Sequence, residues 1–161
     1  MGERGLVTDS AAEFDAALPD GGVLLALDIG TRTLGVATCD VGWRFATAGK
    51  TLPRGKFGKD SAALREIVAA RKVAGIVIGL PRNMDGSEGP RCQASRAYGR
   101  NLAEAFGLPV LLWDERWSTA SAEAAMIGQD MSRAKRATRI DSHAAAVILQ
   151  AAIDRLAGSA F

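Results

Sequence analysis

Acidic side chains stand at three places where the sequence predicts the end of a strand or the start of a helix. Asp28 follows a short apolar run, the pair Asp114 and Glu115 follows another, and Asp141 opens the last expected helix. Active sites in open α/β sheets gather at the carboxyl ends of parallel strands, so we expect these carboxylates to meet at one edge. Either member of the Asp114–Glu115 pair can supply the second acid.

Clustered carboxylates of this kind suit hard divalent cations. Mg²⁺ binds a few carboxylate oxygens and completes its shell with water or phosphate oxygens. Two ions about 4 Å apart activate a water molecule and stabilise the leaving oxygen of a phosphodiester. Each acid also has an ordinary explanation: Asp141 suits a first helical turn, and Glu115 can pair with Arg116. As a set, Asp28, Glu115 and Asp141 predict a catalytic site for Mg²⁺ or Mn²⁺, with two ions.

Other polar residues near these acids are candidates for binding a substrate phosphate. Thr31 and Arg32 follow the first acid in a turn, and stabilising that turn is the alternative role. Asn83 and Asp85 lie in a loop expected at the same edge, where Asp85 is either a fourth acid or part of an ordinary Asp-Gly turn. Arg116 can position the neighbouring carboxylate or a phosphate.

The elements that must position these residues can be predicted from apolar runs, helical spacing and turn residues. Short apolar runs bounded by glycine indicate buried strands, and apolar residues at helical spacing indicate helices. Strands are expected at 23–29, 34–39, 43–51, 75–80 and 109–113, and helices at 61–72, 90–107, 118–127 and 141–158. This order predicts an α/β fold with a mixed five-stranded sheet, strand order 3-2-1-4-5, and helices on both faces. The first strand is central, antiparallel to the second and parallel to the fourth and fifth.

Residues 1–21 are expected to be an N-terminal extension outside the core, and residues 22–161 to form one domain. Ser10 and Glu13 resemble a capping box that opens a short helix ending near Leu18. The 161-residue chain is large enough for one domain with a core of its own. Because it has no apolar run of membrane-spanning length and no signal-like start, we expect a cytoplasmic protein without membrane contact. Two cysteines without metal-site spacing agree with a reducing compartment.

Basic residues are unevenly distributed along the chain. The first 20 residues are acidic, and the remainder carries net positive charge. The bases gather in residues 44–59 and in a connector before the last helix, where they are Arg133, Lys135, Arg136 and Arg139. Such clusters suit the phosphate backbone of a nucleic acid, although a solvated basic surface is the ordinary alternative.

Four segments extend the acidic positions into longer motifs: LALDIGTRTLGVA, IVIGLPRNMDGSEGP, LLWDERWSTASAEA and RIDSHAAAVILQ. With them the chain resembles the YqgF/RuvX family of RuvC-like proteins over residues 23–157. Members of this family are described as Holliday junction resolvases or as pre-16S rRNA nucleases. The resemblance implies a ribonuclease H-like fold, a cytoplasmic location and a metal-dependent endonuclease, and its acidic residues map onto Asp28, Glu115 and Asp141.

The expected function is hydrolysis of phosphodiester bonds in 5′-end processing of pre-16S rRNA. The alternative is a Holliday junction resolvase in DNA recombination, and a more remote one is a non-catalytic nucleic-acid-binding module. An actin-like ATPase is disfavoured because the chain has a single Asp-x-Gly hairpin. The partner is a nucleic acid, and the protein is a monomer or a homodimer. Symmetric cutting of a junction needs a two-fold dimer, and the absence of a heptad helix favours the RNA substrate.

Overall fold

The computed structural model describes residues 5–19, 22–117 and 133–158, with side chains for all of these except 117 and 133–141. Its elements are β1 (Val7–Thr8), α1 (Ala11–Ala17), β2 (Val23–Ile29), β3 (Thr33–Cys39), β4 (Ala46–Ala48), β5 (Leu52–Pro53), α2 (Phe57–Arg71), β6 (Val73–Leu80), α3 (Pro90–Phe106), β7 (Val110–Asp114), the 3-10 helix η1 (Glu115–Trp117) and α5 (Arg133–Gly158). Among these helices, none is long and apolar enough to cross a bilayer.

The described strands form one mixed sheet in the order β1-β7-β6-β2-β3-β4, with β5 also paired to β3. β2 is antiparallel to β3 and parallel to β6, and β6 is parallel to β7. The predicted order 3-2-1-4-5 is therefore confirmed for the five expected strands. The sheet has seven strands rather than five because β1 adds an edge and the third expected strand is divided.

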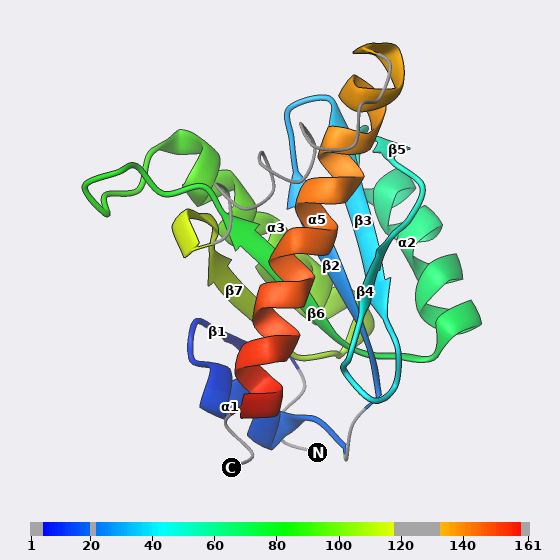
Figure 1. Ribbon diagram of the computed structural model, residues 1–161, viewed down its shortest axis with the longest axis vertical. Coiled ribbons are helices and arrows are strands. Elements are labelled where there is room, and N and C mark those ends of the chain that lie inside the picture. The colour runs from blue at the N-terminus through cyan, green and yellow to red at the C-terminus, as the bar shows by residue number, and fades with distance from the viewer. Residues whose placement is uncertain (1–4, 20–21, 118–132, 159–161) are drawn as a thin grey trace.

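Helices cover both faces of the sheet, as predicted. Figure 1 shows α5 lying across one face, where it packs against β2, β3, β4 and β6. Leu24 and Ala26 of β2 share this face with Leu149 of α5. The alternate residues Leu25 and Leu27 belong to the second apolar cluster, together with residues of α2 and α3. Successive strand residues point to opposite faces of the sheet. Alternate residues of β2 therefore pack with α5 on one face and with α2 and α3 on the other.

The N-terminal segment packs onto the sheet, which corrects the expectation that it lies outside the core. Val7 pairs with Val110, so β1 extends the sheet beyond β7. Phe14 of α1 is fully buried in the same cluster as α5. Half of the predicted capping box is confirmed, since the Ser10 side chain accepts a hydrogen bond from the backbone N–H of Glu13. The backbone N–H of Ser10 donates to the Thr8 hydroxyl and not to Glu13. A strand of two residues carries no periodicity, so its pairing could not be read from the sequence.

The third expected strand, at 43–51, is wrong as a continuous element. Residues 40–45 form a turn in which the Asp40 carboxylate accepts backbone N–H groups of Gly42, Arg44 and Phe45. Trp43 has a positive φ of 57°, which no strand residue adopts. Pairing to β3 resumes only at β4 and again at β5. The physical cause is the Asp40 side chain, which satisfies the N–H groups that a strand would have paired.

The last helix begins earlier than predicted, at Arg133 rather than near Asp141. Asp141 therefore lies inside α5, not at its first turn. The four basic residues expected in a connector belong to the first two turns of the helix: Arg133, Lys135, Arg136 and Arg139. Residues 133–140 contain neither glycine nor proline, so nothing in them stops a helix from starting there. The helix expected at 118–127 falls outside the described residues.

Candidate active site

Asp28 and Glu115 lie at the carboxyl ends of β2 and β7, on the face that α5 covers. Asp28 is two residues after Ala26, and Glu115 is two residues after Trp113; both of these preceding residues pack in the α5 cluster. β6 runs between the two strands, parallel to both. The sheet thus directs the two carboxyl groups to the same side of the same edge.

Gly79 of β6 makes the room that these carboxyl groups occupy. A Cβ atom at this position would lie 2.9 Å from Cγ of Glu115 and 3.0 Å from its Cδ. It would also lie 2.7 Å from Cδ1 of Ile148 in α5. These distances are shorter than real Cβ contacts, so only glycine lets Glu115 and α5 approach the sheet here. Gly79 was not among the predicted site residues.

The carboxyl groups of Asp28 and Glu115 interact directly. Burial raises the pKa of Glu115 to about 7, and the negative charge of Asp28 and a hydrogen bond between the two carboxyl groups contribute to this rise. Arg91 acts in the opposite direction and lowers the pKa of Glu115. Near neutral pH the pair therefore holds a proton that two isolated carboxylates would have released. Such a pair of oxygen donors fits a divalent cation, which would relieve the repulsion and take the place of the proton.

Asp114, the other candidate for the second acid, forms ion pairs with two arginines instead. Its side chain is 2% exposed, and Arg116 donates to it from Nε at 3.0 Å and from Nη2 at 2.6 Å. Arg82 forms a further ion pair with it, between Nη1 and Oδ2, at 3.5 Å. Hydrogen bonds from Arg116 hold the pKa of Asp114 below its usual value. Of the two neighbours, Glu115 is the one that the structure brings to Asp28.

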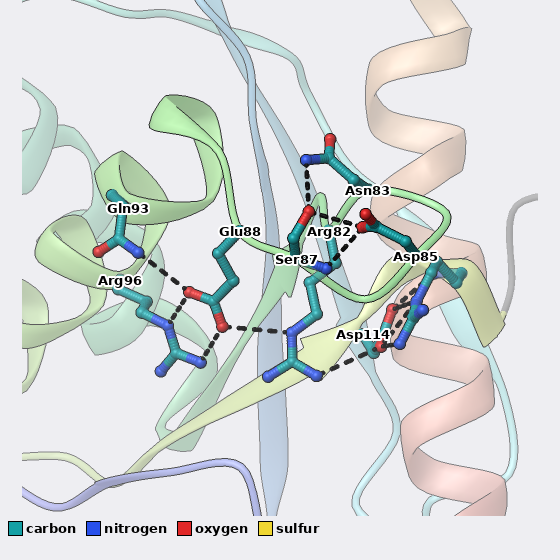
Figure 2. Close-up of polar contacts among 9 residues, drawn as sticks. Arg82, Asn83, Asp85, Ser87, Glu88, Gln93, Arg96 and Asp114 are labelled. Carbon is teal, nitrogen blue, oxygen red and sulfur yellow. Dashed lines mark hydrogen bonds and ion pairs between the residues drawn. The ribbon is translucent and has the colours of Figure 1, made fainter.

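The loop 81–89 holds Asn83 and Asp85 in contacts of its own (Figure 2). Asp85 Oδ1 accepts hydrogen bonds from the backbone N–H of Ser87 at 2.9 Å and from its hydroxyl at 2.6 Å. Asn83 Nδ2 donates to the same hydroxyl at 3.0 Å. The hydrogen bonds from Ser87 lower the pKa of Asp85. Both residues thus shape an exposed loop, and Asp85 carries its negative charge there.

Figure 2 also shows how ion pairs fasten this loop to α3 and β7. Glu88 accepts two hydrogen bonds from Arg96, both at 2.6 Å, and these bonds lower the pKa of Glu88 to about 2. Arg82 lies between Glu88 and Asp114, with its Nε 3.3 Å from Oε2 of Glu88. Arg116 therefore belongs to a chain of ion pairs that reaches α3 through Asp114 and Arg82.

Two arginines flank the turn that follows Asp28. Arg54 Nη1 donates to the carbonyl oxygen of Gly30 at 2.7 Å, and Arg91 Nη2 donates to that of Ile29 at 3.4 Å. The predicted phosphate contacts Thr31 and Arg32 have exposed side chains in this turn. Arg54 lies in the predicted basic cluster 44–59 but was not singled out, and Arg91 lies outside both predicted clusters, because in the sequence neither belongs to a motif.

Asp141 lies one helical turn before Ala145, a fully buried residue of α5. Its side chain, like those of the four predicted basic residues of α5, falls outside the described residues. Within the part of the chain whose side chains are described, no group of three His, Cys, Asp or Glu residues is placed to hold a metal. The structure therefore shows two of the three predicted ligands in contact.

Sequence comparison relates the chain to a known protein family. The sequence model of the family described as "RuvX: Holliday junction resolvase" matches residues 22–155. A protein of Novosphingobium aromaticivorans is 67% identical over 97% of this chain and all of its own length, and one of Cereibacter sphaeroides is 54% identical over 94% of each. Both carry the name "Putative pre-16S rRNA nuclease".

Among solved structures, RuvC of T. thermophilus in complex with a Holliday junction substrate has a TM-score of 0.56 and 17% sequence identity. The match covers 86% of this chain and 97% of that one. At this identity the likeness concerns the fold, and it confirms the expected ribonuclease H-like architecture. The length of the family match and the identity to full-length relatives together show that this chain belongs to the RuvX family.

Proposed function

We propose that the protein is a metal-dependent endonuclease that hydrolyses phosphodiester bonds in pre-16S rRNA in the cytoplasm. The observation that carries this proposal is the contact between Asp28 and Glu115 at the carboxyl ends of parallel strands, with a raised pKa for Glu115. When both carboxyl groups of such a pair ionise, their repulsion destabilises the folded protein unless a cation neutralises them. A purely structural contact would not need two acids, because a single acid or an amide makes a hydrogen bond without the repulsion between two carboxylates.

Asp28 and Glu115 would hold the metal, Mg²⁺ or Mn²⁺ as two ions, together with Asp141. Helical spacing supports the third position, because Asp141 is four residues before Ala145 and seven before Ile148, whose Cδ1 packs over Gly79. When bound, the ions would supply an activated water molecule and stabilise the leaving oxygen.

The chain itself prepares this site in three ways. Gly79 leaves the space in which Glu115 approaches Asp28. Burial raises the pKa of Glu115 to about 7 in the absence of a cation, so ionisation of this group and cation binding are coupled. The Asp114 carboxylate accepts hydrogen bonds from the backbone N–H and the guanidinium of Arg116 in η1. These bonds fix the backbone beside Glu115.

The names of the relatives support precursor 16S rRNA as the substrate. The basic residues of α5 and the exposed Thr31 and Arg32 are the proposed backbone contacts, and Asn83, Asp85 and Arg116 are further proposed substrate-binding residues. A second candidate, the four-way DNA junction, is favoured by the description of the matching family. A resolvase needs two sites related by a two-fold axis, whereas trimming of an RNA end needs one.

The test presents labelled precursor 16S rRNA ends and a synthetic four-way junction to the same preparation, with its mass in solution measured. We expect cleavage of the RNA with Mg²⁺ or Mn²⁺, and loss of it with Glu115→Gln. The exposed Glu66→Gln in α2 is the matched control and should cut normally. Cleavage that persists in excess chelator would exclude the metal-dependent mechanism. If a dimer makes paired symmetric nicks in the junction and leaves the RNA intact, the substrate is the junction and not the RNA.

Neutralising the four basic residues of α5 provides a separate measure of nucleic-acid binding. For a single strand, removing one basic residue that neutralises a phosphate reduces the slope of log affinity against log salt by about 0.7. We expect weaker binding to all sequences and a flatter slope. An unchanged slope would mean that these residues do not bind the backbone.

A further inference from the structure

A small cavity lies beside the turn that follows Asp28, on the side of the sheet that faces α3. Its volume is about 170 Å³, several times the ~30 Å³ that one water molecule takes up in the liquid. Its polar and charged lining comes from Gly30, Thr31, Arg54, Arg91 and Ser95. The described residues that line it include two guanidinium groups and no carboxylate.

Arg54 is held rigidly at the wall of this cavity. Its Nη1 donates to the carbonyl oxygen of Gly30 at 2.7 Å, and its backbone N–H donates to that of Arg32 at 2.8 Å. Its guanidinium lies over the ring of Tyr98, 5.5 Å from the centroid. A cation placed over an aromatic face is stabilised in that orientation.

The support beneath Arg54 is itself buried and fully bonded. The hydroxyl of Tyr98 donates to Oδ2 of Asp60 at 3.1 Å, and Oδ1 of Asp60 accepts the backbone N–H of Gly55 at 2.9 Å. Asp60 is 3% exposed. This chain of contacts fixes the loop that carries Arg54, so the guanidinium is positioned before any ligand arrives.

Within the described residues, neither arginine of the cavity forms an ion pair with a carboxylate, unlike Arg82, Arg96 and Arg116, although the charge of Arg91 acts on Glu115. Among the described residues, Arg91 donates a single hydrogen bond, to the carbonyl oxygen of Ile29 at 3.4 Å. A guanidinium has five N–H donors, so most donors of both groups remain for a ligand. Planar pairs of N–H groups match the oxygens of a phosphate.

We propose that this cavity binds a backbone phosphodiester of the substrate strand, next to the bond that is cut, through Arg54 and Arg91. The inference rests on the proposed function, because the cavity lies beside the turn that follows Asp28 and the charge of its Arg91 acts on Glu115. A phosphate seated there fixes the register of the strand relative to the two carboxyl groups. Contacts to phosphates position a nucleic acid without reading its sequence.

The test measures binding of a short 2′-O-methyl oligoribonucleotide, without divalent ions, over a range of salt concentrations. Arg54→Gln and Arg91→Gln should each weaken binding and flatten the salt slope by about 0.7. The matched control is Arg65→Gln, because Arg65 also stacks on an aromatic ring, that of Phe106, and donates to a backbone carbonyl outside the cavity. The control should bind as the wild type does. Thermal unfolding checks that the variants are folded, and the exposed Arg91 provides a variant that leaves the Tyr98 support intact.

A scan with single neutral methylphosphonates then locates the phosphate. One internal position should weaken binding of the wild type and Arg65→Gln, but not of Arg54→Gln or Arg91→Gln. Absence of such a coupled position, or coupling only to a terminal phosphate, would overturn the proposal. Because no divalent ion is present, the result does not depend on cleavage. A protein that shows the coupling but cuts no substrate would refute the nuclease and not the phosphate site.

Discussion

The shared proton of Asp28 and Glu115 predicts an unusual dependence of stability on pH. The pKa of Glu115 is raised from 4.5 to about 7 in the folded protein. A raised carboxyl pKa means that the folded state keeps a proton that the unfolded state has released. The stability associated with the protonated group is therefore complete below about pH 4.5 and is lost as the pH rises to about 7.

The size of this effect follows from the pKa difference. At about 1.4 kcal/mol for each pKa unit, the free energy of unfolding should fall by roughly 3 kcal/mol across this interval. Glu115→Gln removes the ionisable group and keeps its shape, so this variant should not show the loss. Above pH 7 and without divalent ions, it should exceed the wild type by roughly 5–10 °C in melting temperature.

Asp28→Asn separates the two causes of the raised pKa. Burial is the larger cause and remains in this variant, whereas the charge of Asp28 is removed. We expect an intermediate curve, with Glu115 losing its proton at a lower pH than in the wild type. Mg²⁺ should stabilise the wild type above pH 7 and have little effect on either variant.

The assay is chemical denaturation at a series of pH values, with Glu66→Gln as a control for loss of a carboxylate at an exposed position. The curves of the wild type and Glu115→Gln should diverge as the pH rises from about 4.5 to about 7. Parallel curves over that range would refute the pairing of Asp28 with Glu115 as described.

The packing of the site and of the N-terminal segment supports three further predictions. Gly79→Ala should reduce cleavage at least tenfold, because the added Cβ displaces Glu115. The control is Gly58→Ala in α2, where no atom lies within 4 Å of the added Cβ, and this variant should cut normally. Equal activity of the two variants would contradict the close approach at Gly79. Asp114→Asn should lower the free energy of unfolding in denaturant melts, because it removes the negative charge that pairs with Arg82 and Arg116. An unchanged midpoint would show that these ion pairs are not needed. Phe14→Ala should cost about 3–5 kcal/mol in the same melts, and a loss below about 1 kcal/mol would mean that α1 is not part of the core.

The central strands could be predicted because their physical cause is local. Residues 23–29 and 73–80 are short apolar runs with glycine beside or within them, and burial on both faces requires such runs. The meeting of Asp28 with the Asp114–Glu115 pair could be predicted from strand order alone. The choice of Glu115 came only from the family resemblance, because physically it depends on which way the chain turns after β7.

Other features depend on contacts between distant segments. The role of Gly79 follows from the approach of Ile148 in α5, which no local pattern reports. Asp141 was mistaken for a first-turn residue because an acidic residue suits the start of a helix as well as a functional position inside one. Arg54 becomes distinctive only through Tyr98, a residue of another helix.

The attachment of β1 and α1 has a consequence for how the chain folds as it is made. Val7 pairs with Val110, and Phe14 packs in the cluster that contains Leu149 and Leu156 of α5. The ribosome delivers the N-terminal segment first, but the partners of that segment arrive last, and pairings of such long sequence separation form slowly. An incomplete chain therefore presents Phe14 to solvent or to chaperones, while β2, β3 and β6 can already pair. The edge of the sheet closes only after β7 has been synthesised, and Phe14 is covered only after the C-terminal helix follows.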